Sequence, residues 1–160
     1  MSSTDTGSTV LAPGTQVPDF KLVTEGGEDF TQAELRGSAA TVFVFYPFAF
    51  SPVCTDQLQI YEKSLAEITS QGAEIYGVSC DSSWAQKAFR EKLDVSIPQL
   101  SDFEPKGAAC SAFGVLHPGG FPQRALVIVG GDGVVRWSYQ APSPADLPPV
   151  HMILGGLKNT

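Results

Sequence analysis

Charged side chains are scarce in this chain of 160 residues, and basic ones are the scarcer kind. Asp, Glu, Lys and Arg together make up 17% of the sequence, below the usual share of about a quarter. Ten Lys and Arg residues stand against 17 Asp and Glu residues, which gives a net charge of −7. Nucleic acids and anionic membranes require a basic patch, so we expect neither as a partner. The low charge favours an apolar-leaning surface and self-association.

Long apolar segments are also missing. No stretch approaches the length of a membrane-spanning helix. Residues 1–12 are rich in Ser, Thr and Gly and lack both the basic start and the apolar stretch of a secretory signal. We therefore expect a cytoplasmic protein, with a flexible tail over 1–12 and one domain over 13–160.

Histidine and cysteine are too few for the common structural metal sites or a disulfide scaffold. His117 and His151 lie far apart in the sequence and no Cys-x-x-Cys occurs, so we expect no metal. The three cysteines, Cys54, Cys80 and Cys110, are an odd count, whereas secreted disulfide scaffolds are shorter and richer in cysteine. Each of them is either a small buried apolar side chain or a reactive thiol, and composition leaves both readings open.

The order of apolar patterns along the chain predicts an α/β fold. Residues 40–46 are an uninterrupted apolar and β-branched run, typical of a strand buried on both faces, and 53–70 show helical spacing. We expect further strands at 20–24, 28–30, 73–79, 97–100, 124–129 and 134–139, and further helices at 31–37, 84–93, 106–113 and 147–157. This order predicts a thioredoxin-like fold with a central mixed sheet flanked by helices.

Cys54 lies just after the predicted strand 40–46, in the first turn of the predicted helix. Unpaired backbone N–H groups and the helix dipole favour a negative charge at that position. Because the thiolate is the nucleophilic form of cysteine, this placement predicts that Cys54 is the reactive thiol.

The residues around Cys54 resemble the signature of the peroxiredoxin family. Pro47, Ser51 and Cys54 match its pattern Pro-x-x-x-Ser/Thr-x-x-Cys. The resemblance continues through Val17-Pro18-Asp19-Phe20, Val78-Ser79-Cys80-Asp81, Leu100-Ser101-Asp102-Phe103 and Arg124. The segments 45–51 and 101–105 are most similar to the AhpE-type, one-cysteine branch of actinobacteria.

The resemblance implies a peroxidase that uses no metal or organic cofactor. Cys54 would attack a hydroperoxide and become sulfenic acid, and Arg124 would stabilise both the thiolate and the leaving oxygen. Ser51 would hydrogen-bond the thiolate or the peroxide, and Pro47 would shield the sulfur. Simpler roles stay open, because Arg124 also suits a solvated strand end, Ser51 a helix cap and Pro47 a strand terminator.

The sequence departs from the family pattern at several positions, two of which concern the chemistry of the site. Gln57 stands where many members carry a glutamate that bonds the arginine, so we expect a weaker or rewired network. Gln59 stands where one branch carries a second, resolving cysteine. Cys80 and Cys110 stay open as resolving cysteines, but the default expectation is a one-cysteine mechanism with an external thiol.

The implied partners are a hydroperoxide substrate and a thiol reductant, either mycothiol with a mycoredoxin or a thioredoxin-like protein. The low charge and the resemblance together favour a homodimer. Trp84 and Trp137 are interpreted as core or interface residues. An alternative function with the same cysteine is a peroxide sensor or redox relay.

Overall fold

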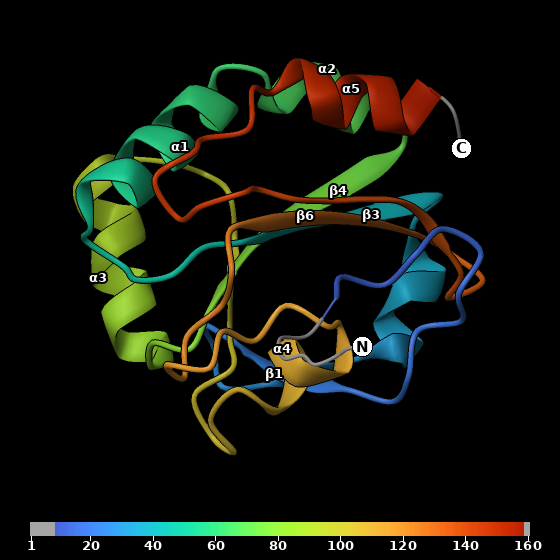
Figure 1. The fold of residues 1–160 in the computed structure, drawn as a ribbon. Helices are drawn as coiled ribbons and strands as arrows, with labels where there is room; N and C mark the ends of the chain where they lie inside the picture. Colours follow the sequence, from blue (N-terminus) through green and yellow to red (C-terminus); the bar gives the residue numbers. More distant parts are fainter. Residues whose placement is uncertain (1–8, 159–160) are drawn as a thin grey trace.

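Seven strands form one sheet in the order β2-β1-β5-β4-β3-β6-β7 (Figure 1). Their bounds in the computed structural model, which describes residues 9–158, are β1 Lys21–Thr24, β2 Asp29–Thr31, β3 Ala40–Phe45, β4 Ala73–Ser79, β5 Gln99–Ser101, β6 Ala125–Gly130 and β7 Val135–Gln140. The central strand β3 pairs in parallel with β4 and antiparallel with β6. The sheet is therefore mixed, and the predicted thioredoxin-like α/β fold is confirmed.

Helices cover both faces of this sheet. They are the 3₁₀ helix η1 Gln32–Gly37 and the α-helices α1 Pro52–Glu62, α2 Leu65–Ser70, α3 Ser83–Leu93, α4 Ala108–Ala112 and α5 His151–Lys158. Figure 1 shows α1, α2 and α5 on one side of the central strands and α4, with β1, on the other. Two separate apolar clusters fill the two sides.

Strand β3 supplies side chains to both clusters. All six of its residues are buried, as expected for a strand covered on both faces. Val42 and Val44 join the cluster under α1, α2, α3 and α5, whereas Phe43 and Phe45 join the cluster that contains α4. Burial on both sides fixes the register, because a slip by one residue would exchange the two sets of side chains.

The N-terminal caps of two helices are those that the sequence predicts. Thr31 and Glu34 form a capping box at η1. Ser82 caps α3, and its Oγ accepts the N–H of Ala85 at 3.2 Å.

The helix expected over 53–70 is in fact two helices, which corrects the prediction. The amides of Lys63 and Ser64 bond the carbonyls three residues back, Ile60 and Tyr61, and this tight turn ends α1. The break lets α2 pack on β4 in a new direction, with Ile68 buried in the same cluster as α1.

The last helix also begins later than predicted. Pro148 and Pro149 precede α5 instead of lying in its first turn, because a residue before proline is disfavoured in the helical region. Trp84 is 82% exposed, so the core interpretation of this residue is wrong and the interface interpretation remains.

The predicted tail over 1–12 is described only from residue 9, and residues 1–8 lie outside the described residues. Val10 and Leu11 pack against the apolar cluster, and the amide of Leu11 donates to the carbonyl of Phe113 at 3.1 Å. Ordered packing therefore begins before Pro13. Among residues 9–158, no helix has the length and apolarity needed to span a bilayer.

Candidate active site

Cys54 lies in the first turn of α1, as the sequence predicts. A short loop leads from β3 through Pro47 to Ser51 at the N-cap position, and Pro52 occupies the first helical position. Proline suits this position because its missing N–H would have no partner inside the helix. Cys54 is fully buried and faces the cluster that contains α1 and α5. Its sulfur is thus held near the unpaired N–H end of a helix and away from bulk water.

Arg124 brings a positive charge to this sulfur. Its Nη2 donates to Cys54 Sγ at 3.2 Å, and its Nε donates to the carbonyl of Pro144 at 2.7 Å. The residue precedes β6, whose pairing with β3 opposes Ala125 to Phe45, and it is only 2% exposed. A solvated strand end is therefore the wrong interpretation of Arg124.

Gln57 takes the place of the expected carboxylate in this network. Its Oε1 accepts from Arg124 Nη1 at 2.5 Å, and its Nε2 donates to the Tyr61 hydroxyl at 3.2 Å. Tyr61 in turn donates to the carbonyl of Pro148 at 2.5 Å. Burial raises the pKa of Tyr61 to about 12, although the Gln57 hydrogen bond opposes this shift, so the hydroxyl remains a proton donor.

The rewired network leaves the charge of Arg124 directed at one sulfur. Gln57 is a neutral acceptor, and among residues 9–158 no carboxylate lies within ion-pair distance of Arg124. A cation with its other donors on neutral oxygens favours the anionic form of the group it faces.

A cavity of about 340 Å³ lies in front of Arg124. Its walls are mostly apolar and are formed by Pro47, Phe48, Ser51, Pro52, Val53, Phe121, Arg124, Pro144 and Ala145. Three of the four predicted site residues line this space: Pro47, Ser51 and Arg124. The fourth, Cys54, does not line it but accepts a hydrogen bond from Arg124. The structure thus brings all four together.

Ser51 holds the loop that precedes the helix. Its Oγ and its amide both bond the carbonyl of Phe48, at 2.9 and 3.3 Å. Ser51 makes no side-chain capping bond, so the helix-cap interpretation is wrong for its hydroxyl. Phe50, within this turn, has a φ of +71°, which an L-residue adopts only where the surrounding structure holds it.

Three contributors to the site carry no sequence signal. Pro144 and Phe121 come from loops, and Pro148 contributes only its backbone carbonyl. Every residue has a backbone carbonyl oxygen, so the residue type does not indicate which carbonyl will accept a hydrogen bond in the site.

Cys80 and Cys110 lie apart from Cys54. Both belong to the apolar cluster on the other side of the sheet, and both are buried and reduced. His117 stacks on Phe121, with ring centroids 4.3 Å apart. The one group among the described residues with metal-ligand spacing consists of Cys80, Asp102 and Cys110.

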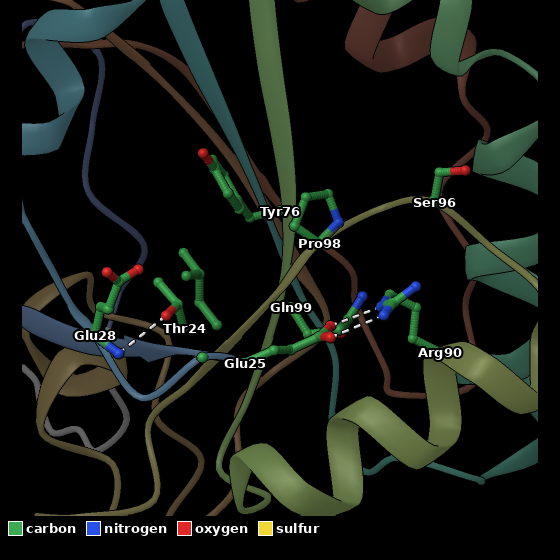
Figure 2. Close-up of a pocket in the computed structure, with 10 residues that line it drawn as sticks. Thr24, Glu25, Glu28, Tyr76, Arg90, Ser96, Pro98 and Gln99 are labelled. Atoms are coloured by element: carbon green, nitrogen blue, oxygen red, sulfur yellow. Dashed lines mark hydrogen bonds and ion pairs between the residues drawn. The ribbon is translucent and has the colours of Figure 1, made fainter.

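Another cavity, of about 370 Å³, lies elsewhere (Figure 2). Figure 2 shows Arg90 of α3 paired there with Glu25, and their N–O distances are 2.7 and 2.9 Å. Its walls include Thr24, Tyr76 and Gln99 but no cysteine. Since its arginine already has a carboxylate partner, this cavity offers neither a thiol nor an unpaired cation among its lining residues.

Comparison with known proteins agrees with the geometry. Residues 13–138 match the AhpC/TSA family. Alkyl hydroperoxide reductase C of Amphibacillus xylanus is 35% identical over 130 residues, 77% of this chain and 69% of that protein. Alkyl hydroperoxide reductase E of Mycobacterium tuberculosis is 28% identical over 130 residues, 81% of this chain and 85% of that protein. The crystal structure of Enterococcus faecalis AhpC is similar with a TM-score of 0.80 at 25% identity, covering 91% of this chain and 90% of that one.

Proposed function

Since this chain belongs to the AhpC/TSA family and is a peroxiredoxin, a thiol-dependent hydroperoxide reductase, we propose that Cys54 is its peroxidatic residue. The observation that carries this proposal is the 3.2 Å contact between Arg124 Nη2 and Cys54 Sγ at the start of α1. A helix N-terminus and a guanidinium whose other partners are neutral both favour the thiolate.

The reaction is a two-electron displacement at oxygen. The Cys54 thiolate forms a bond to one peroxide oxygen while the O–O bond breaks, and the electron pair leaves with the other oxygen. That oxygen takes a proton and departs as water or an alcohol, while the sulfur is left as sulfenic acid. Arg124 faces the sulfur and also lines the cavity, so its donors reach the oxygen on which charge develops.

Pro47 and Ser51 shape the entrance to this reaction. Pro47 has no N–H with which to bind the thiolate, and its ring forms part of the cavity wall. The Ser51 hydroxyl donates to the carbonyl of Phe48 and keeps lone pairs toward an incoming peroxide. Apolar neighbours such as Phe48 and Phe121 support acceptance of organic hydroperoxides besides hydrogen peroxide.

An external thiol regenerates Cys54 in this proposal. Cys80 and Cys110 lie in the cluster across the sheet from Cys54, and a disulfide requires α-carbons within about 7 Å. Their placement in a different apolar cluster from Cys54 supports a one-cysteine mechanism. A small thiol such as mycothiol, with a mycoredoxin, or a thioredoxin-like protein would reduce the sulfenic acid.

A homodimer is the assembly that the surface supports. Four large apolar side chains are exposed over about half of their area or more: Phe48, Phe50, Trp84 and Phe103. Isolated apolar residues are common on surfaces, but Phe48 and Phe50 both belong to the loop before Cys54, and Phe103 lines a cavity together with Phe48. Light scattering after size exclusion should give twice the chain mass, and Trp84→Glu should shift the protein toward the monomer. An unchanged dimer in the variant would place the interface elsewhere.

Stopped-flow oxidation tests the proposal directly. Wild-type protein should be oxidised by hydrogen peroxide in a fast phase and turn over with an external thiol, and Cys54→Ser should lose both the fast phase and the rapid turnover. Circular dichroism of the variant checks that the fold is intact. A folded Cys54→Ser protein that still turns over at the wild-type rate would assign the activity to another residue. Fast oxidation with negligible turnover would instead favour the sensor or relay function.

A further inference from the structure

Two cysteines that the peroxidase reaction does not use lie together on the other side of the sheet. Cys80 directly follows β4, and Cys110 belongs to α4. Their sulfur atoms and a carboxylate oxygen of Asp102 all lie within 4.8 Å of one another. Cys110 has no exposed surface and Cys80 is 7% exposed, so the pair reaches solvent only through Cys80.

Backbone contacts hold Cys110 in place. Asp102 accepts the amide of Ala109 on Oδ1 at 3.0 Å and the amide of Cys110 on Oδ2 at 2.7 Å. These bonds tie the start of α4 to the end of β5. Because both carboxylate oxygens already accept hydrogen bonds from the backbone, the cluster suits thiol chemistry better than metal binding.

The two thiols are not equivalent. The neighbouring Cys110 thiol, whose sulfur lies within 4.8 Å of the Cys80 sulfur, is the main cause that lowers the pKa of Cys80, with Lys106 assisting. The same interaction, together with burial and Asp102, raises the pKa of Cys110 well above its usual range. A more acidic, accessible sulfur beside a buried protonated partner is the arrangement of a nucleophilic cysteine with its resolving cysteine.

A cavity of about 330 Å³ leads to Cys80. Its walls include Phe103 and Lys106, as well as Pro47 and Phe48. The last two residues also line the cavity in front of Arg124. A small oxidant therefore has a route to Cys80 through this cavity.

We propose that Cys80 and Cys110 form a second redox site, a dithiol that a small hydroperoxide converts into an intrachain disulfide. The Cys80 thiolate attacks one peroxide oxygen, the O–O bond breaks, and the leaving oxygen takes a proton from solvent. Cys110 then attacks the Cys80 sulfenic acid, loses its proton, and forms the S–S bond while water departs. Two thiols and one hydroperoxide thus give one disulfide, one alcohol or water, and one further water.

The test uses full-length protein carrying Cys54→Ser, so its outcome does not depend on the role of Cys54. Reduced protein is treated with a small excess of hydrogen peroxide in the presence of a chelator, quenched in acid, and alkylated under denaturing conditions. Trypsin should place Cys80 on peptide 64–87 and Cys110 on peptide 107–124. We expect a protein lighter by two hydrogen atoms and a disulfide joining these two peptides.

Matched double variants assign the roles of the two sulfurs. Cys54→Ser with Cys110→Ser should stop at a sulfenic acid on Cys80 that dimedone traps. Cys54→Ser with Cys80→Ser should leave Cys110 fully alkylatable, because its thiol is buried and protonated. Circular dichroism confirms folding in each case.

Two results would overturn the proposal. One is complete alkylation of both cysteines after peroxide treatment of the folded Cys54→Ser protein. The other is sulfenic acid on Cys110 in the absence of Cys80, with none on Cys80 in the absence of Cys110. If wild-type protein shows no peroxidase activity but still forms the Cys80–Cys110 disulfide, only the proposed role of Cys54 is contradicted.

Discussion

At the scale of single residues, the site depends on how the guanidinium of Arg124 divides its donors. Nε holds the Pro144 carbonyl, Nη1 holds Gln57, and Nη2 is left for Cys54. Two contacts thus fix the plane of the group, and the third is made to the Cys54 sulfur. This forked geometry is specific to arginine, since a lysine offers one point charge.

Replacing Arg124 should therefore slow Cys54 oxidation. We expect Arg124→Ala to lower the rate by on the order of 10²-fold, as for a lost donor to a developing oxyanion. Arg124→Lys should also be slow, because the charge returns without the fork. Stopped-flow oxidation by hydrogen peroxide measures both variants.

Arg136→Lys is the matched control for this prediction. Arg136 lies on the partly exposed strand β7 and pairs with Asp132 at 2.8 Å, away from the site. Its substitution should leave the oxidation rate unchanged, because exposed pairs contribute little. Equal rates for wild type and Arg124→Ala would remove Arg124 from the site.

At the scale of elements, the loop between β3 and α1 is held from the end of β4. Asp81 Oδ2 accepts the amide of Ala49 at 2.8 Å and the hydroxyl of Ser79 at 2.8 Å. One carboxylate thus joins the end of β4 to the loop that contains Pro47. Carboxyl ends of neighbouring parallel strands meet at one sheet edge, which makes this bond possible.

Loss of that carboxylate should loosen the loop without touching the sulfur. We expect Asp81→Ala to slow Cys54 oxidation by roughly 10-fold, since small misplacements at a reacting centre are costly. Asp81→Asn keeps an acceptor oxygen and should retain most of the rate. Ser82→Ala, at the next residue, should cost about 1 kcal/mol of stability through the lost α3 cap but leave the rate unchanged. Equal slowing by the Asp81 and Ser82 variants would point to general destabilisation.

The packing of α5 offers a second test at this scale. A Cβ at Gly156 would come within 2.8 Å of the Trp137 ring and 2.9 Å of Ile128, whereas a Cβ at Gly155 meets nothing within 4 Å. Gly155→Ala should therefore raise stability by up to about 1 kcal/mol through helix propensity. Gly156→Ala should lower it by roughly 1–3 kcal/mol, because the helix must move away from the sheet. Urea unfolding measures both, and equal shifts would contradict the close approach of α5.

At the scale of the whole molecule, Tyr61 links the first long helix to the segment before the last one. Its hydroxyl donates to the Pro148 carbonyl, and Gln57 connects it to Arg124. The C-terminal part of the chain is thus tied to the active-site network through one buried phenol.

Alkaline pH should weaken this tie. The pKa of Tyr61 is raised from 10.0 to about 12 in the folded protein, so its contribution to stability is complete below pH 10 and is lost as pH rises toward 12. The stability difference between wild type and Tyr61→Phe should shrink over that range by on the order of 2 kcal/mol. Urea unfolding of both proteins across the range measures it, and other titrating groups cancel in the comparison. A difference that is constant with pH would contradict a buried, protonated Tyr61.

The sequence alone determined the elements whose signals are local. The apolar run of β3, the Ser82 cap and the proline at the start of α1 each depend on neighbouring residues, so they predicted Cys54 at a helix N-terminus correctly. The four site residues were named from the same segment and from the family resemblance. The predicted cytoplasmic location and external reductant stay predictions.

Only the tertiary structure decided which groups meet. Arg124 reaches Cys54 across 70 positions because β6 pairs antiparallel with β3, and its other partners include a backbone carbonyl that no residue type announces. The adjacency of Cys80 and Cys110 arises in the same way, where α4 and the residue after β4 enter one apolar cluster. Periodicity and capping act over a few residues, whereas strand order and side-chain packing join distant segments, and the chemistry of this protein depends on those distant contacts.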